Sequence, residues 1–186
     1  MTGCLIGSSG LDGIVIEADD VTLDLNGFTL SGVPGSLNGI SIPNRRRNVV
    51  IEGGTLRGWG ENGVNGMGTA IESRYESLRV FDCGADGLRA GAGSVVVGCL
   101  AANNVDEGIH VTDDCTVTQR DVFGNNRDGL QALGANNLIL GNRVGGNGAD
   151  FNIGSGNAFG PLVAAAGAGD LGGVAGADHP LANLVR

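Results

Sequence analysis

The chain has 186 residues, a length typical of one domain, and 41% of them are hydrophobic, which is enough to fill a core. Aromatic residues make up only 4%, so this core must be aliphatic, and 36 glycines beside 4 prolines without a Gly-X-Y period exclude collagen. The net charge of −9 repels phosphate backbones and argues against nucleic acid as a partner.

The first residues do not show the pattern that is typical of a signal peptide. The stretch Met1–Leu11 lacks a basic start and an apolar run, so we expect no signal peptide in this sequence. No stretch of 18 apolar residues occurs anywhere in the chain, so no membrane span is expected either.

A repeat starts at Asp12 and dominates the sequence. Its core is an acidic residue or Asn, then Gly, then an aliphatic residue, and the seventh copy, at Asp150–Ile153, is degenerate. The apolar member of each copy recurs every 21 to 26 residues. These residues are Ile14, Ile40, Val64, Leu88, Ile109, Leu130 and Phe151. Such a period is the signature of a solenoid.

Each repeat unit continues with two more apolar spots. The second spot comprises Val21/Leu23, Val49/Ile51, a weak version near Tyr75, Val95/Val97, Cys115/Val117 and Leu138/Leu140. The third comprises Phe28/Leu30, Leu56, Leu78/Val80, Ala101, Val122 and Val144. Turns rich in asparagine close several units, at Asn103–Asn104, Asn125–Asn126 and Asn147.

Three short strands in 21 to 26 residues leave no room for a helix. Stacked at about 4.8 Å, such coils pair every strand with the coils above and below and bury the apolar columns. The sequence therefore predicts an all-β, right-handed parallel β-helix of about seven coils with three short strands each. Stacked asparagines at the turns would form ladders of side-chain hydrogen bonds.

The pattern ends after Pro161. We expect residues 1–162 to form the β-helix, and residues 163–186 to form an Ala/Gly-rich linker and a C-terminal tail. The apolar segment His179–Val185 is expected to pack back on the helix or on a neighbouring molecule.

The run Asp12–Gly32 resembles the opening coils of bacterial right-handed parallel β-helix repeat proteins of the pectin-lyase-like superfamily. The end, Ala149–Val163 followed by His179–Val185, is similar to the closing coil and tail of that group. The resemblance implies a secreted or cell-surface protein. It implies little about activity, because the superfamily includes polysaccharide lyases, hydrolases, epimerases and members without known chemistry. The NTD, GHG and RxK blocks of polygalacturonases and the RxPxxR and DH motifs of pectate lyases are missing.

One outward-facing strip follows the first apolar column. Its members are Val15, Ser41, Asn65, Arg89, His110, Gln131 and Asn152. An enzyme acting on a polysaccharide would use Arg89 and His110, with Asp113 and Asp114 nearby, as base and charge stabiliser. A solvated polar face without chemistry is the interpretation that we favour, so no catalytic residue and no cofactor are expected.

A second column places acidic residues or asparagines before the first strand of each coil. Its members are Asp12, Asn38, Asn62, Asp86, Glu107 and Asp128. Repulsion between stacked carboxylates is relieved either by local bonds to the backbone two residues on, which we favour, or by a bound Ca²⁺ at Asp86, Glu107 and Asp128.

A third feature is a line of aromatic residues, Trp59, Phe81 and Phe123, expected on the outside after the third strand. Rings in a row stack on sugars or seat a partner. The tail or a neighbouring subunit would otherwise cover them.

Taken together, these features favour a non-catalytic extracellular or cell-surface structural or adhesive module, which self-associates end to end into an oligomer or filament. The alternatives are a polysaccharide lyase or hydrolase and a glycan-binding module, both with polysaccharide as the partner.

Overall fold

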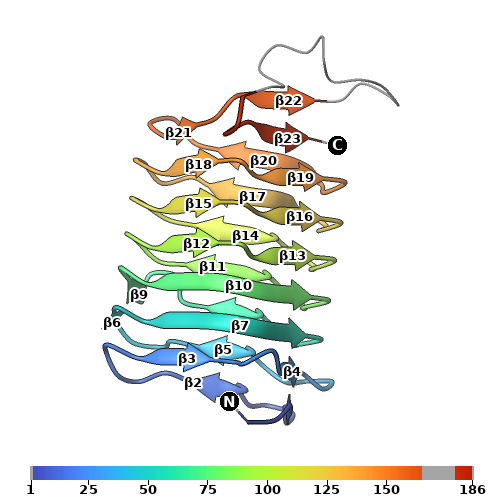
Figure 1. The fold of residues 1–186 in the computed structure, drawn as a ribbon. Coiled ribbons are helices and arrows are strands. Elements are labelled where there is room, and N and C mark those ends of the chain that lie inside the picture. The colour runs from blue at the N-terminus through green and yellow to red at the C-terminus, as the bar shows by residue number, and fades with distance from the viewer. Residues whose placement is uncertain (1, 165–178, 186) are drawn as a thin grey trace.

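The protein is an all-β parallel solenoid of about eight turns, one more than the sequence indicated. The structure, a computed structural model, describes residues 2–164 and 179–185. Successive turns stack along one axis, with the first strands at one end and β22 at the other (Figure 1). All strand pairs are parallel, as expected for coils that run in the same direction. The hand of the coil stays a prediction.

Three sheets carry the strands. The 7-stranded sheet comprises β2 (Ile14–Val15), β5 (Ile40–Ser41), β8 (Val64–Asn65), β11 (Leu88–Ala90), β14 (Ile109–Val111), β17 (Asp128–Ala132) and β20 (Ala149–Ile153). The small sheet pairs β6 (Arg46–Arg47) with β9 (Ala70–Ile71).

The 14-stranded sheet has two rows that meet in its longest strands, β7 (Val50–Arg57) and β10 (Arg74–Phe81). One row adds β3 (Thr22–Asp24), β12 (Val95–Val97), β15 (Thr116–Thr118), β18 (Leu138–Leu140) and β21 (Ala158–Phe159). The other adds β1 (Leu5–Ile6), β4 (Thr29–Ser31), β13 (Leu100–Ala102), β16 (Asp121–Phe123), β19 (Arg143–Gly145), β23 (Asn183–Val185) and β22 (Leu162–Ala164).

The predicted apolar columns form the core. In the 7-stranded sheet, Ile14, Ile40, Val64, Leu88, Ile109, Leu130 and Phe151 pair directly from turn to turn. The five middle members have no exposed surface. The column from Leu30 to Val144 is likewise in register and buried. Burial of this kind contributes about 25 cal/mol per Å² of apolar surface, so these columns hold the coils together.

The prediction of the second apolar column was wrong by one residue in two turns. Val96 and Ile139 point inward, in register with Val117, whereas Val95, Val97 and the Leu138/Leu140 pair lie on the outer face. In both turns three consecutive residues are apolar, so the period-2 pattern that separates the two faces is absent from the sequence.

The C-terminal segment enters the sheet out of chain order. β23 lies between β19 and β22 and pairs with both. Asn183 continues a ladder: its Oδ1 accepts from the Asn142 backbone N–H at 3.0 Å. The predicted boundary after residue 162 falls within β22, and most of the predicted linker, residues 165–178, lies outside the described residues.

Asparagine ladders close the turns, as predicted. The Asn104 Nδ2 donates to Asn125 Oδ1 at 2.9 Å, and Asn125 Nδ2 donates to Asn147 Oδ1 at 2.8 Å. All four cysteines are free thiols. Residues 2–164 and 179–185 contain no helix with the length and apolarity needed to cross a bilayer.

Candidate functional site

The outward strip is in the predicted register. Arg89 on β11 pairs with His110 on β14, and His110 pairs with Gln131 on β17. Because alternate residues of a strand face opposite sides, burying Leu88 and Ala90 directs Arg89 outward. The same argument directs His110 outward between Ile109 and Val111.

The acidic column runs beside this strip and is bonded between turns. Asn62 Nδ2 donates to Asn38 Oδ1 at 2.8 Å, and Asn62 Oδ1 accepts from the Asp86 backbone N–H at 3.1 Å. Asp86 Oδ1 accepts in turn from the Glu107 backbone N–H at 3.0 Å. The expectation of local bonds two residues along the chain is wrong here, because the backbone N–H of the next turn lies within hydrogen-bond distance of the side-chain oxygen.

Strip and column converge on one open pocket of about 400 Å³. It is lined by Asn62, Ala85, Asp86, Arg89, Asp106, Glu107, His110, Arg127 and Gln131. The residues of the strip and of the column were both predicted from the sequence, but as two separate features. Their convergence depends on the short turn between column and strand, in which one glycine separates the acid from the inward aliphatic residue.

Asp86 is the centre of the pocket. Its Oδ2 lies 3.3 Å from Arg89 Nε and 3.6 Å from His110 Nδ1. Asp86 and Glu107 are only 4% and 7% exposed, and the His110 side chain is 15% exposed. Two acids and an imidazole are thus held together, largely out of water.

The two acids differ in their protonation. Burial and the hydrogen bond and negative charge of Asp86 raise the pKa of Glu107 to about 7. Burial alone would raise the pKa of Asp86 as well, but hydrogen bonds from His110 and Glu107 and the charge of Arg89 lower it below its ordinary value. Near neutral pH Asp86 is therefore ionised, whereas Glu107 is only partly ionised.

Asp128 belongs to a neighbouring network. Its Oδ2 accepts from Gln131 Nε2 at 2.6 Å and from Asn152 Nδ2 at 2.7 Å. Gln131 also donates to Glu107 Oε1 at 3.2 Å, so Asp128 contacts the pocket only through an amide. The ligand atoms of Asp86, Glu107 and His110 lie within 4.8 Å of one another, and Asp128 is not one of this group.

Asp113 and Asp114 do not join His110. Both are exposed in the turn after β14, where Asp113 Oδ1 accepts from the Ala135 backbone N–H at 2.8 Å and Asp114 Oδ1 accepts from Asn136 Nδ2 at 3.1 Å. Their nearness to His110 in sequence is misleading, because the chain turns a corner after Val111. Arg127, which lies 3.7 Å from Glu107 Oε1, was missed as a pocket residue. Its position one residue before Asp128 was the available signal.

The aromatic line is shorter than predicted. Trp59 is 1% exposed and lies in the core, where its Nε1 donates to the Leu30 carbonyl at 3.2 Å. A Cβ on Gly13 would lie 2.5 Å from the indole, so this glycine makes room for the ring. The partner of Phe81 on the preceding turn is Arg57, and the outward expectation for Trp59 is wrong.

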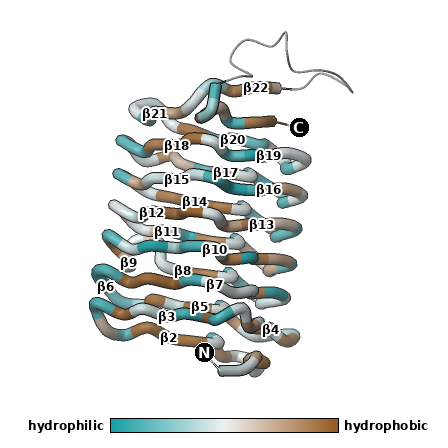
Figure 2. Tube along the Cα trace, viewed as in Figure 1, coloured by the Kyte–Doolittle hydropathy of each residue, from teal (hydrophilic) through white to brown (hydrophobic). Residues whose placement is uncertain are grey.

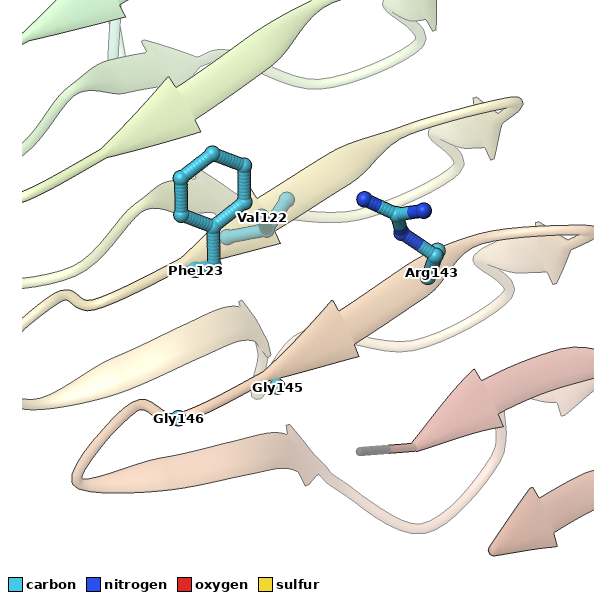
Figure 3. A pocket seen from close by; sticks show the side chains of 5 residues that line it. All are labelled: Val122, Phe123, Arg143, Gly145 and Gly146. Atoms are coloured by element: carbon cyan, nitrogen blue, oxygen red, sulfur yellow. The ribbon is translucent and has the colours of Figure 1, made fainter. Parts of the chain in front are cut away.

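Phe123 remains on the surface at the end of β16, 39% exposed, and Phe81 is half-buried. Phe123 borders a hollow of about 460 Å³ (Figure 3). Gly145, its register partner on β19, has no side chain to fill the space, and Gly146 follows it. Arg143 lines the same hollow and pairs with Asp121 at 2.9 Å.

Compared with protein families, with curated proteins and with solved structures, the chain gives no significant match.

Proposed function

We propose that the protein is a non-catalytic, secreted or cell-surface adhesive module that binds a neutral polysaccharide. We also infer that it is a right-handed β-helix of the pectin-lyase-like superfamily, on the resemblance of its first and last coils. The proposal rests on one observation above all: an aromatic hollow and a polar pocket border the same turn.

The aromatic hollow suits the face of a sugar. The exposed Phe123 ring offers a surface for sugar C–H groups, and the missing side chain at Gly145 leaves space beside it. The ion pair of Arg143 and Asp121 stands at the rim, where a charged donor and a charged acceptor can bind hydroxyl groups.

The polar pocket suits a second sugar of the same chain. Phe123 and Arg127 are four residues apart on one turn, and Arg127 lines the polar pocket with Arg89, His110 and Gln131. The net charge of −9 disfavours polyuronates, which favours an uncharged glycan.

Affinity electrophoresis in gels containing neutral glucans, mannans, xylans or galactans tests the proposal. We expect one of these polymers to retard the protein, and Phe123→Ala to weaken binding by about tenfold, since hot-spot aromatics contribute 1 kcal/mol or more. Phe159→Ala, which removes another exposed ring (51%), is the matched control and should leave retardation unchanged.

Retardation by no polymer, or equal retardation of Phe123→Ala, would contradict the proposal. The same polymers are assayed for new reducing ends and for unsaturated products. Turnover that depends on Arg89 and His110 would favour the enzymatic alternative, which the grouping of Asp86, Glu107 and His110 keeps in view.

End-to-end association is a second candidate, favoured by hydrophobic residues in the first strands, where β2 is brown in Figure 2. Ile6, Leu11 and Val15 are 75%, 60% and 48% exposed there. A hollow of about 380 Å³ beside them is lined by Ile14, Val15, Ile16, Glu17, Ala18, Val21, Thr22 and Leu23. Light scattering should show assembly that grows with protein concentration and is abolished by Val15→Lys; a monomer at all concentrations would rule this candidate out.

A further inference from the structure

We propose that Asp86, Glu107 and His110 bind a divalent transition-metal ion, with Zn²⁺ as the best fit. The inference goes beyond glycan binding and does not depend on it. It begins from geometry: one carboxylate oxygen of each acid and one imidazole nitrogen lie within 4.8 Å of one another. That spacing allows all three to reach one ion at bond lengths of about 2.0–2.2 Å after small side-chain movements.

The three groups are held by the solenoid itself. Asp86 and Glu107 occupy equivalent positions on successive turns, and the bond from the Glu107 backbone N–H to Asp86 Oδ1 fixes that carboxylate. Asp86 Oδ2 is thereby left facing His110. A preformed set of ligands spares an ion most of the cost of ordering them.

The donor set selects the metal. Imidazole nitrogen favours zinc and similar ions, whereas Ca²⁺ requires six to eight oxygen ligands. The group offers two carboxylates and one nitrogen, and Asp128, the third oxygen donor of the calcium hypothesis, is not one of this group. Three protein ligands leave a coordination position for solvent or for a ligand in the pocket.

Histidine distinguishes this group from an ordinary cluster of acids. On the two turns before Asp86 the same column carries Asn38 and Asn62, and the strip beside them carries Ser41 and Asn65. Among the described residues the acids and an imidazole converge only at Asp86, Glu107 and His110.

Arg89 competes with the ion. Its Nε lies 3.3 Å from the Asp86 oxygen that faces His110, and its side chain is 32% exposed, so it can turn into solvent. Removing Arg89 should therefore strengthen metal binding, although it makes the protein more acidic by only one charge. Arg143→Ala, which removes an arginine from the other hollow, is the matched charge control.

Isothermal titration calorimetry of the metal-stripped chain with ZnCl₂ at neutral pH tests the proposal, in a Cys4→Ser background because the Cys4 thiol is exposed. We expect one Zn²⁺ per chain, weaker binding of Mn²⁺, and still weaker binding of Ca²⁺. His110→Ala and Glu107→Gln should each weaken Zn²⁺ binding at least tenfold. Arg89→Ala should tighten it several-fold, whereas Arg143→Ala and Asp113→Asn should change it less than twofold.

Undiminished Zn²⁺ binding by His110→Ala, or equal effects of Arg89→Ala and Arg143→Ala, would overturn the proposal. A spectroscopic measurement keeps the test decisive if a variant folds poorly: Mn²⁺ should broaden the amide NMR signals nearest residues 86, 107 and 110 of the unaltered chain. Broadening centred elsewhere would also overturn it. The metal titrations are done without glycan, and the polysaccharide experiment is repeated in the presence of a chelator. Each proposal is thus tested without the other.

Discussion

The column before the 7-stranded sheet differs between its first turns and its middle turns. Among the first turns, the two that follow Asp12 carry Asn38 and Asn62, which form an amide ladder in which each side chain both donates and accepts. In the middle turns Asp86 and Glu107 occupy the same positions, and a carboxylate can accept the next N–H but cannot donate. The first turns are stabilised by their ladder; the middle turns retain charge and hold it with His110, Arg89 and Arg127.

The two parts of this column show how a repeat acquires a site. One backbone position, kept by the stacking of turns, carries an inert amide in one part of the molecule and a carboxyl group with a shifted pKa in another. Burial is similar in both parts, since Asn62 is 5% and Asp86 4% exposed. The chemistry of the pocket therefore comes from residue type rather than from a change of fold.

Breaking the amide ladder should have the largest effect. Asn62→Ala removes the acceptor of the Asp86 N–H and the donor to Asn38, leaving buried polar groups without partners. We expect the free energy of unfolding to fall by about 2–3 kcal/mol. Urea denaturation measures it, with Asn65→Ala on the outer face as the control. A loss below 0.5 kcal/mol for Asn62→Ala would show that the ladder contributes little.

Neutralising Glu107 should have a smaller effect that depends on pH. Its pKa in the folded protein, about 7, lies above the ordinary 4.5, so the stability that protonated Glu107 contributes is lost as pH rises between these values. Glu107→Gln mimics the protonated acid. We expect it to be about 1–2 kcal/mol more stable than the unaltered protein at pH 8 and equally stable at pH 4.5. The same difference at both pH values would contradict the proposed protonation.

Asp86→Asn, which extends the amide ladder by one turn, should have the smallest effect on stability. Asp86→Asn keeps an acceptor for the Glu107 N–H and removes the negative charge that, after burial and the hydrogen bond of Asp86, raises the Glu107 pKa. Asp86→Asn weakens the pairing with Arg89 and His110 but relieves the repulsion of Glu107, so we expect the free energy of unfolding at pH 7 to change by less than about 1 kcal/mol. In a carboxyl NMR titration, the midpoint of Glu107 should fall from about 7 toward its ordinary value. An unchanged midpoint would mean that burial alone sets it.

Much of the fold could be predicted from the sequence, because a side chain in a solenoid faces the same side of the sheet as its register partners on neighbouring turns. Ile40, Leu88 and Ile109 lie in one buried column, as their spacing indicates. The exceptions have local causes. Where three apolar residues follow one another, as at Val95–Val97, the sequence does not tell which face is buried.

The pocket could be predicted only in part. Spacing along the chain shows that Arg89 lies beside His110, but not how far either lies from Asp86, which is on the same turn as Arg89 and on the turn before His110. At the corners between strands, the alternation of a strand no longer sets the direction of a side chain. Trp59 and Asp113 both lie just beyond a strand end, and the former points into the core whereas the latter points away from the pocket.

Anomalous diffraction from crystals soaked in ZnCl₂, recorded on both sides of the zinc absorption edge, tests most directly whether the middle turns form a site that the first turns lack. We expect one strong peak bonded to Asp86, Glu107 and His110, and none beside Asn38 or Asn62. A density map without that peak, or with zinc bound only at other side chains, would contradict this expectation.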